Sequence, residues 1–483
     1  MNKPVSPSIE EAKARMQAIL DLQKRANLKK GPPDARLRKD RLSRCIDLLL
    51  AHKDDFISAM NTDFGARSPN MSLFTDIAAA VSPLKNARAQ LEKWMKPQKR
   101  KVTPAALALF GASAEVRYQP KGVVGIISPW NFPVQLAFDA IAGAFAAGNR
   151  VMLKPSEFTP TTSALLAQTI DLYFDEDEMA VIQGGPDVGA AFAGLPFDHL
   201  MFTGATSIGR HVMRAAADNL TPVTLELGGK SPVVVGRSAD LEKTAARVMN
   251  GKTLNAGQVC LAPDYLLAPR ESVDGFVAAA KASVTKMFPT IKDNPDYTAM
   301  INQRHYDRVR GLISDAKAKG AEIVEINPGN EDFGQQEHRK IPPTLILGAT
   351  DEMSVMQEEI FGPVLPVRTY ASIDDTIAEI NARPRPLALY YFGDDEAESE
   401  ALLSRTHSGG VTINDVIFHI AMDDLPFGGV GPSGMGAYHG RRGFVEFSHE
   451  KAVYRQIGSE ILAIMRPPYG DAFRKQMAAR LKP

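Results

Sequence analysis

The chain has 483 residues, 44% hydrophobic and 23% charged, a composition typical of a globular protein with two or three domains. Its 56 Lys and Arg residues balance 56 Asp and Glu residues, so no basic excess points to nucleic acid or an anionic membrane as a partner. Two cysteines cannot form a disulfide framework, and no apolar stretch approaches the ~20 residues of a membrane span, so we expect a cytoplasmic protein with reduced thiols.

The first hundred residues predict helices. Apolar residues recur at a spacing of three to four between Ile9 and Leu20, and Pro32-Pro33 interrupts this pattern. Asp34 is suited to start the next helix, in which Cys45 is expected to serve packing only. The basic run at residues 96–101 indicates a solvated linker.

From about residue 114 the pattern changes to short strands that alternate with helices. The expected strands are residues 114–119, 122–127, 151–153, 180–182, 199–203 and 223–227, and the expected helices are 133–147, 161–173, 188–193 and 207–218. This alternation predicts an α/β fold with a doubly wound parallel sheet of the Rossmann type. Ligands of such sheets bind beyond the carboxyl ends of the strands, where three polar segments fall: 129–131, 154–157 and 204–209.

A second alternating series follows Gly228-Gly229 and predicts another α/β domain that extends to about residue 427. Its expected strands are residues 233–235, 265–267, 344–347, 365–369, 388–392 and 410–413, and its expected helices are 241–253, 273–287 and 304–319. The segment 425–436 is rich in Gly and Pro and is expected to be a functional loop. Residues 471–481 are expected to form a short basic helix.

Two residues suit covalent and acid–base chemistry. Cys260 follows Ala256 and Gly257, which permit a tight turn and the close approach of a second molecule. Taken alone, this thiol is better interpreted as a buried structural cysteine. Glu226 is a lone carboxylate at the end of an apolar strand, where burial would raise its pKa and suit it to act as a base. A carboxylate satisfied by backbone N–H groups is an equal alternative.

Other segments suit a nucleotide. The turn at residues 202–209 joins a strand to a helix, whose N-terminus favours phosphate, although its Gly-x4-Gly spacing fits a tightly packed turn equally well. Lys154 and Glu157 are placed to bind ribose hydroxyls, but two solvated charges are the simpler interpretation. The segment 358–364 is by default a turn with solvated acids. The nine histidines show no metal-ligand spacing, so we expect no metal site.

Taken together, six stretches in chain order resemble the aldehyde dehydrogenase superfamily, and the resemblance extends from about residue 9 to residue 470. The stretches are Pro129-Trp130-Asn131-Phe132-Pro133, Lys154-Pro155-Ser156-Glu157, Phe202-Thr203-Gly204, Leu225-Glu226-Leu227-Gly228-Gly229-Lys230, Gly257-Gln258-Val259-Cys260 and Glu359-Ile360-Phe361-Gly362-Pro363-Val364. Residues 262–265 and 425–440 resemble the class 3 branch, which handles medium-chain and aromatic aldehydes. Among its members the chain most resembles the bacterial coniferyl aldehyde dehydrogenases.

The resemblance implies a role for each matching residue. Cys260 corresponds to the nucleophile, Glu226 to the general base and Asn131 to the side chain of the oxyanion hole. The implied cofactor contacts are Trp130, Lys154, Glu157, Gly204, Ala205, Gly209, Leu227, Glu359 and Phe361. Ala205 departs from the pattern, because many members have Ser there, and this leaves the contacts of the pyrophosphate open.

The resemblance also implies a domain plan and a reaction. Residues 1–100 and 121–228 would form an NAD-binding domain, 229–427 a catalytic domain, and 101–120 with 428–483 a β oligomerisation arm and C-terminal segment of a homodimer. The expected reaction is oxidation of a small aldehyde to the acid through a thiohemiacetal and a thioester at Cys260, with NAD preferred and NADP as a second cofactor. Two alternatives stay open: a non-catalytic nucleotide-binding or structural protein, and a thiol-dependent esterase.

Overall fold

The structure is a computed structural model that describes residues 8–458, 463 and 465–482. The chain divides into two compact units, each built from segments that are distant in the sequence. The larger unit comprises Met1–Trp94 and Pro120–Ser448, and the smaller comprises Met95–Gln119 and His449–Pro483. None of the helices in the described part of the chain combines the length and apolar character needed to cross a bilayer.

The larger unit begins with helices, as predicted. In chain order they are α1 (Ile9–Lys30), α2 (Ala35–Ala51), α3 (Lys53–Phe64), α4 (Pro69–Ser72), the π-helix η1 (Leu73–Ala78) and α5 (Ala79–Trp94). Ser8 and Glu11 form a capping box that starts α1, and Gly31, with a φ of 66°, ends it. Asp34 caps α2 by accepting a hydrogen bond from the Leu37 N–H. The predicted break between these two helices is confirmed.

The first sheet has six strands in the order β15-β7-β6-β3-β4-β5, and all its pairs are parallel except β15 with β7. Its strands are β3 (Val123–Ile127), β4 (Arg150–Lys154), β5 (Met179–Val181), β6 (His199–Thr203), β7 (Val223–Glu226) and β15 (Gly434–Met435). Its helices are α7 (Gln135–Ala147), α8 (Pro160–Tyr173), α9 (Pro186–Ala193) and α10 (Thr206–Ala217). The doubly wound sheet is confirmed; β15 was not predicted, because two residues within a Gly-rich loop leave no pattern.

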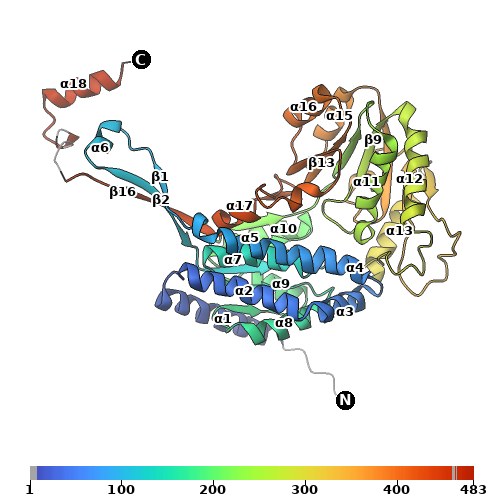
Figure 1. The fold of residues 1–483 in the computed structure, drawn as a ribbon, viewed down its shortest axis with the longest axis horizontal. Helices are drawn as coiled ribbons and strands as arrows, with labels where there is room; N and C mark the ends of the chain where they lie inside the picture. The colour runs from blue at the N-terminus through green and yellow to red at the C-terminus, as the bar shows by residue number, and fades with distance from the viewer. Residues whose placement is uncertain (1–7, 459–462, 464, 483) are drawn as a thin grey trace. The chain divides into compact units, whose positions relative to one another are not determined.

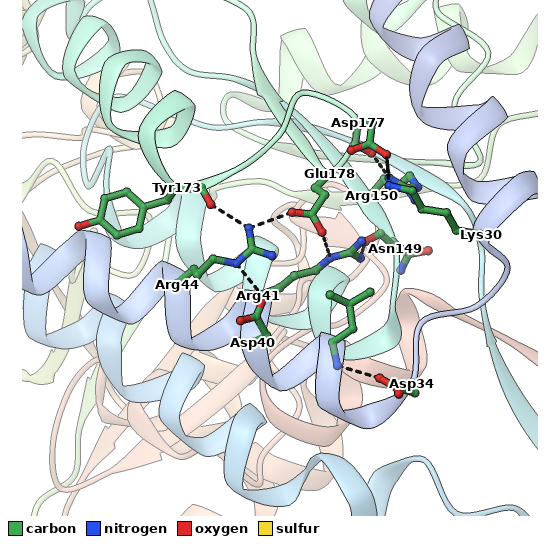
Figure 2. A network of polar contacts seen from close by, with 11 residues as sticks. Lys30, Asp34, Asp40, Arg41, Arg44, Asn149, Arg150, Tyr173, Asp177 and Glu178 are labelled. Atoms are coloured by element: carbon green, nitrogen blue, oxygen red, sulfur yellow. Dashed lines mark hydrogen bonds and ion pairs between the residues drawn. The ribbon is translucent and has the colours of Figure 1, made fainter.

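Arginines of α2 bind the N-terminal helices to this sheet, and Figure 1 shows α2 beside α7 and α8. Arg41 and Arg44 share the carboxylate of Glu178, at 2.9 and 2.8 Å, in the network shown in Figure 2. Arg38 donates hydrogen bonds of 3.0 and 2.8 Å to the last two carbonyls of α7. These contacts cap the C-terminus of α7 with a cation, which complements the helix dipole.

The second sheet has seven strands in the order β10-β11-β12-β9-β8-β13-β14, with only β10 antiparallel to its neighbour. Its strands are β8 (Pro232–Val235), β9 (Tyr265–Pro269), β10 (Glu322–Glu325), β11 (Thr344–Leu347), β12 (Val364–Tyr370), β13 (Ala388–Phe392) and β14 (Gly410–Ile413). Its helices include α11 (Leu241–Thr253), α12 (Val273–Met287), α13 (Gln303–Ala318), α15 (Ile373–Asn381) and α16 (Glu396–Arg405). Every predicted strand of this sheet is present. The edge strand β10 was not predicted, because its two glutamates obscure the apolar pattern of a strand.

The smaller unit contains a three-stranded sheet in the order β1-β2-β16. Its elements are β1 (Gln98–Arg100), α6 (Ala105–Leu109), β2 (Ser113–Pro120), β16 (Ser448–Arg455) and α18 (Asp471–Arg480). The prediction of a linker at residues 96–101 is wrong for Gln98–Arg100, because this basic segment pairs antiparallel with β2. Lysines on an edge strand discourage pairing with other chains, so a basic run and a strand are compatible. The expected basic helix near the C-terminus is confirmed as α18.

Candidate active site

The polar segments predicted to lie together do so at one edge of the first sheet. β3 pairs with β4 on one side and with β6 on the other, all in parallel. The segment that contains Trp130 and Asn131 follows β3, Lys154 ends β4, and Gly204 follows β6. Because carboxyl ends of parallel strands meet at the same edge, these residues lie at one edge of the sheet, where the rule for doubly wound sheets places a ligand crevice.

A strained turn presents Cys260. The 3-10 helix η2 (Leu254–Gly257) contains three consecutive residues with positive φ: Asn255 at 49°, Ala256 at 53° and Gly257 at 71°. A Cβ atom on Gly257 would lie 2.2 Å from the Gly362 carbonyl oxygen, so only glycine fits there. This close approach brings the segment that carries Glu359 and Phe361 onto the cysteine loop, and backbone strain of this kind is concentrated at functional sites.

The Asn131 amide lies at the same loop. Its Nδ2 donates a 3.2 Å hydrogen bond to the carbonyl of Gln258, two residues before Cys260, and the side chain is buried. Asn255 Nδ2 donates to the same Gln258 carbonyl at 3.2 Å and to the Asn131 carbonyl at 3.1 Å. An amide has a second hydrogen, so Asn131 can still donate to an oxygen at the thiol.

A buried ion pair that the sequence did not suggest supports the Asn131 segment. Arg67 donates to the Asn131 carbonyl at 2.9 Å and pairs with Asp76 at 2.5 Å, and both charged side chains are fully buried. The other Asp76 oxygen accepts from the N–H groups of Val134 and Gln135, at 3.2 and 3.3 Å, where α7 begins. The only signal in the sequence was an acid, Asp76, on the apolar side of a helical pattern. This signal does not identify Arg67 as its partner.

Glu226 ends β7 and is 3% exposed. Neither of its carboxyl oxygens has a hydrogen-bond partner among the described residues. Burial, and then the charge of Glu446, raise its pKa well above the usual value. The alternative in which backbone N–H groups satisfy this carboxylate is therefore wrong, and the geometry favours a base with free lone pairs.

The acids and the thiol influence each other. Burial, followed by the charges of Glu359 and Glu226, raises the pKa of Cys260 to about 12. Burial and the charge of Asp264 raise the pKa of Glu359 to about 8. Lys252 is fully buried, its Nζ has no hydrogen-bond partner among the described residues, and burial lowers its pKa to about 8. The Cys260 thiol is therefore neutral and lies near the carboxyl groups of Glu226 and Glu359. Its proton must move to a base before the sulfur can attack.

The crevice fits a dinucleotide. α10 begins at Ala205 without a side-chain cap, so its first N–H groups have no side-chain competitor for an anion. A Cβ on Gly209 would lie 2.7 Å from Leu227, which shows why this helix needs glycine where it packs on Leu227. The Gly204 N–H is used by the Glu226 carbonyl at 3.0 Å, so Gly204 serves the turn through its small size.

The residues predicted to bind ribose are held by specific contacts. Lys154 is buried at the end of β4, and its Nζ lies 3.8 Å from the Glu157 carboxylate. The ring centroids of Trp130 and Phe361 are 5.4 Å apart in an edge-to-face contact, and Phe361 has a positive φ of 47°. No group of three or more His, Cys, Asp or Glu in the described residues is placed to hold a metal ion.

Comparison with known proteins agrees with this geometry. The model of the aldehyde dehydrogenase family matches residues 10–453. The chain is 62% identical over its whole length to a probable coniferyl aldehyde dehydrogenase from Caulobacter vibrioides, all of which is covered. It is 54% identical to a coniferyl aldehyde dehydrogenase from a Pseudomonas strain, over 97% of this chain and 96% of that protein.

Solved structures show the same fold. Staphylococcus aureus AldH in a substrate-bound state superimposes with a TM-score of 0.89 at 36% identity, over 99% of this chain and 100% of that one. A Mycobacterium tuberculosis aldehyde dehydrogenase complexed with NAD+ gives a TM-score of 0.82 at 29% identity, over 92% and 91% of the two chains. The chain therefore belongs to the aldehyde dehydrogenase family, an enzyme family that oxidises aldehydes to carboxylic acids.

Proposed function

We propose that this enzyme oxidises aromatic or medium-chain aldehydes, with coniferyl aldehyde as the leading candidate, and that NAD is its preferred cofactor. The names of the two relatives at 62% and 54% identity support the substrate. Two structural neighbours were solved with NAD+, which supports the cofactor. Glu157 beside Lys154 would repel a 2′-phosphate, so NADP is the weaker cofactor. The observation that carries the proposal is that Asn131 is bonded to the Gln258 carbonyl, two residues before Cys260, while Glu226 is close enough to Cys260 to raise the pKa of its thiol.

The chemistry begins at sulfur. Burial raises the pKa of the Cys260 thiol to about 12, so its proton must move to a neighbouring base before the sulfur attacks the aldehyde carbon. The developing alkoxide is stabilised by the Asn131 amide and the Cys260 N–H, and losing one such donor costs about 2.7–4 kcal/mol. When bound, the nicotinamide cofactor supplies the hydride acceptor.

Hydrolysis completes the reaction. The thioester at Cys260 is open to water, and Glu226 is the base that deprotonates this water. Its raised pKa and its unpartnered oxygens suit that task near neutral pH. With a base beside the nucleophile, the product is the free acid.

The remaining parts of the proposal concern organisation. We propose the domain division 1–100 with 121–228 for NAD binding, 229–427 for catalysis, and 101–120 with 428–483 as the oligomerisation arm and C-terminal segment of a homodimer. The separate sheet β1-β2-β16, with an open strand edge at β16, supports an arm that pairs with a second copy. Both cysteines are free thiols, which supports a cytoplasmic location.

The direct experiment compares the two cysteines. Cys260→Ala should abolish aldehyde-dependent NADH formation and retain NAD binding, whereas Cys45→Ala, a change at the buried thiol of α2, should keep both. Glu226→Gln should give a burst of NADH, measured by stopped-flow absorbance, followed by little turnover. Retained turnover in Cys260→Ala, or a wild-type steady rate in Glu226→Gln, would remove the corresponding role.

A panel of aldehydes tests the substrate and the alternatives. Coniferaldehyde and benzaldehyde should react faster than hexanal and acetaldehyde with NAD. A rate highest for hexanal would keep the enzyme class and discard coniferyl aldehyde. NAD binding without reduction by any aldehyde would favour the non-catalytic alternative, and ester hydrolysis without NAD as the main activity would favour the esterase.

A further inference from the structure

We propose that Asp139, supported by Gln135 and His439, binds the phenolic hydroxyl of a 4-hydroxyaryl aldehyde and thereby selects for hydroxylated aromatic substrates. This inference rests on the proposed function, because it assigns a substrate contact within the same site. It concerns residues that neither the motifs nor the mechanism above uses.

Asp139 is a buried acid with one oxygen left over. It lies on α7, one turn after Gln135, and is 4% exposed. Its Oδ2 accepts a hydrogen bond from Gln135 Nε2 and lies 3.5 Å from His439 Nε2. Its Oδ1 has no hydrogen-bond partner among the described residues. A buried polar atom without a partner costs about 1–3 kcal/mol, so an acid retained there indicates a partner from outside the chain.

The groups around this oxygen are uncharged and complementary to a hydroxyl. Burial raises the pKa of Asp139 well above its usual value and lowers the pKa of His439 to about 4. A protonated acid and a neutral imidazole can each donate one hydrogen bond and accept another. His439 Nε2 and the Tyr438 hydroxyl also lack partners among the described residues. A phenol, which donates and accepts and is neutral, satisfies these groups without burying a charge.

Aromatic side chains surround the same point. The rings of His439 and Phe427 stack with centroids 5.0 Å apart and an angle of 26° between planes. Tyr438 meets His439 edge to face at 4.4 Å and Phe427 at 5.9 Å. Offset and edge-to-face contacts of this kind are the ones that an aryl ring of a ligand can extend. A polar end on an aromatic wall matches a phenol better than it matches an alkyl chain.

This cluster adjoins the reacting residues. α7 starts directly after the Asn131 segment, and β15, three residues before Tyr438, pairs with β7 at Glu226. Burial, followed by the proximity of Asp139, Glu226 and Cys260, raises the pKa of the Tyr438 hydroxyl well above its usual value, so this hydroxyl is near all three groups. In a 4-hydroxycinnamaldehyde the phenolic oxygen is the atom farthest from the reacting carbon. An acid one helical turn beyond the oxyanion segment is placed to meet that end.

A small pocket adjoins Asp139 and His439. Its cavity volume is about 10 Å³, which is room for a group the size of one water or one hydroxyl. Asp139 and His439 are the polar residues on a wall otherwise made by small and apolar residues of α5, α7 and α17 (Gly440–Glu446). Pro83, Ala87, Ala142 and Gly143 are among these. Among the side chains that line this pocket, only Asp139 and His439 can form hydrogen bonds with a hydroxyl.

The test uses two substrates that differ by one hydroxyl. Wild-type enzyme and the variants Asp139→Asn and Asp139→Leu are assayed with 4-hydroxycinnamaldehyde and with cinnamaldehyde, and Asp424→Asn, a change at an exposed acid, serves as the control. Asp139→Leu should lower kcat/KM for the hydroxylated substrate about 10- to 100-fold, the range for losing one buried hydrogen bond, and leave cinnamaldehyde within about threefold. Asp139→Asn keeps the shape of the side chain and should lose less.

Binding provides a readout that needs no turnover. In the Cys260→Ala background, the Kd of 4-hydroxycinnamaldehyde should be lower than that of cinnamaldehyde, and Asp139→Leu should remove the difference. Equal losses for both substrates, or no loss for either, would overturn the inference. If the wild type reduces NAD with neither aldehyde yet binding shows the Asp139-dependent preference, the proposed function fails while the recognition of the phenol stands.

Discussion

The buried pair of Arg67 and Asp76 leads to a sharp prediction about catalysis. Arg67 is the only group that holds the Asn131 carbonyl from the side of the N-terminal helices in the described structure, at 2.9 Å, while Asn255 holds it from the cysteine loop at 3.1 Å. Arg67→Met removes the first contact and leaves Asp76 buried without its cation. Since removal of one partner of a buried pair costs about 3–5 kcal/mol, we expect a loss of stability of this order.

The same change should slow the reaction. With only Asn255 left, the Asn131 segment can shift, and a misplacement of about 1 Å in a catalytic group costs about 100-fold in rate. We therefore expect kcat to fall by about 10- to 100-fold, within the limit of about 100- to 1,000-fold for loss of a whole oxyanion donor. The KM for NAD should change little, because none of the predicted cofactor contacts touches Arg67.

Arg67→Lys separates positioning from stability. Lysine keeps a charge beside Asp76, but its single ammonium group cannot reproduce the fork that reaches both Asp76 and the Asn131 carbonyl. Urea unfolding should then show a smaller loss of stability than in Arg67→Met, whereas NADH formation should show a similar loss of kcat. Arg88→Met, which breaks a bond to Ser43 on the helical surface, is the control. Wild-type kcat in Arg67→Lys, or equal losses in Arg88→Met, would refute the reasoning.

Three further predictions concern charge. The pKa of Glu359 is raised to about 8 by burial and Asp264, and the Glu359 carboxylate is the form that accepts hydrogen bonds from ribose hydroxyls. The KM for NAD should therefore fall as the pH rises through about 8. Glu359→Gln should flatten this pH profile. Glu157→Gln should raise kcat/KM for NADP relative to NAD, measured with one aldehyde at saturation; an unchanged ratio would contradict the role of this acid. Burial alone would raise the pKa of Glu178, but Arg44 and Arg41 lower this pKa overall. The stability that the Glu178 carboxylate adds is therefore present above its unfolded pKa of about 4.5 and is lost as the pH falls below that value. Glu178→Gln should weaken this loss of stability at acid pH, measured by urea unfolding.

The order of strands and helices could be predicted from the sequence because their signals are local. Helix α11 (Leu241–Thr253), β6 (His199–Thr203) and β13 (Ala388–Phe392) have the predicted bounds. Apolar periodicity and capping residues operate within one or two turns of chain. The strands that were not predicted, β1, β10, β15 and β16, are short, charged or Gly-rich, and their existence depends on a partner strand elsewhere.

The catalytic candidates were named by motif, and the structure supplied their surroundings. No pattern around Glu226 shows that its oxygens lack partners, and no pattern around Gly257 shows that the Gly362 carbonyl lies where a Cβ would be. Arg67 could not be connected to Asn131 across 64 residues. These facts depend on segments that meet only in the folded chain.

The sequence alone therefore determined the family and the alternating architecture and pointed to Cys260 as the proposed nucleophile, because each of these rests on residues adjacent in the chain. The tertiary structure decided which surroundings shift the pKa values of the site residues. Burial, the absence of hydrogen-bond partners and the approach of distant charges set the protonation states of Cys260, Glu226 and Asp139. Desolvation and Coulomb interactions depend on distances in space, and such distances do not exist until the two sheets and their loops have packed.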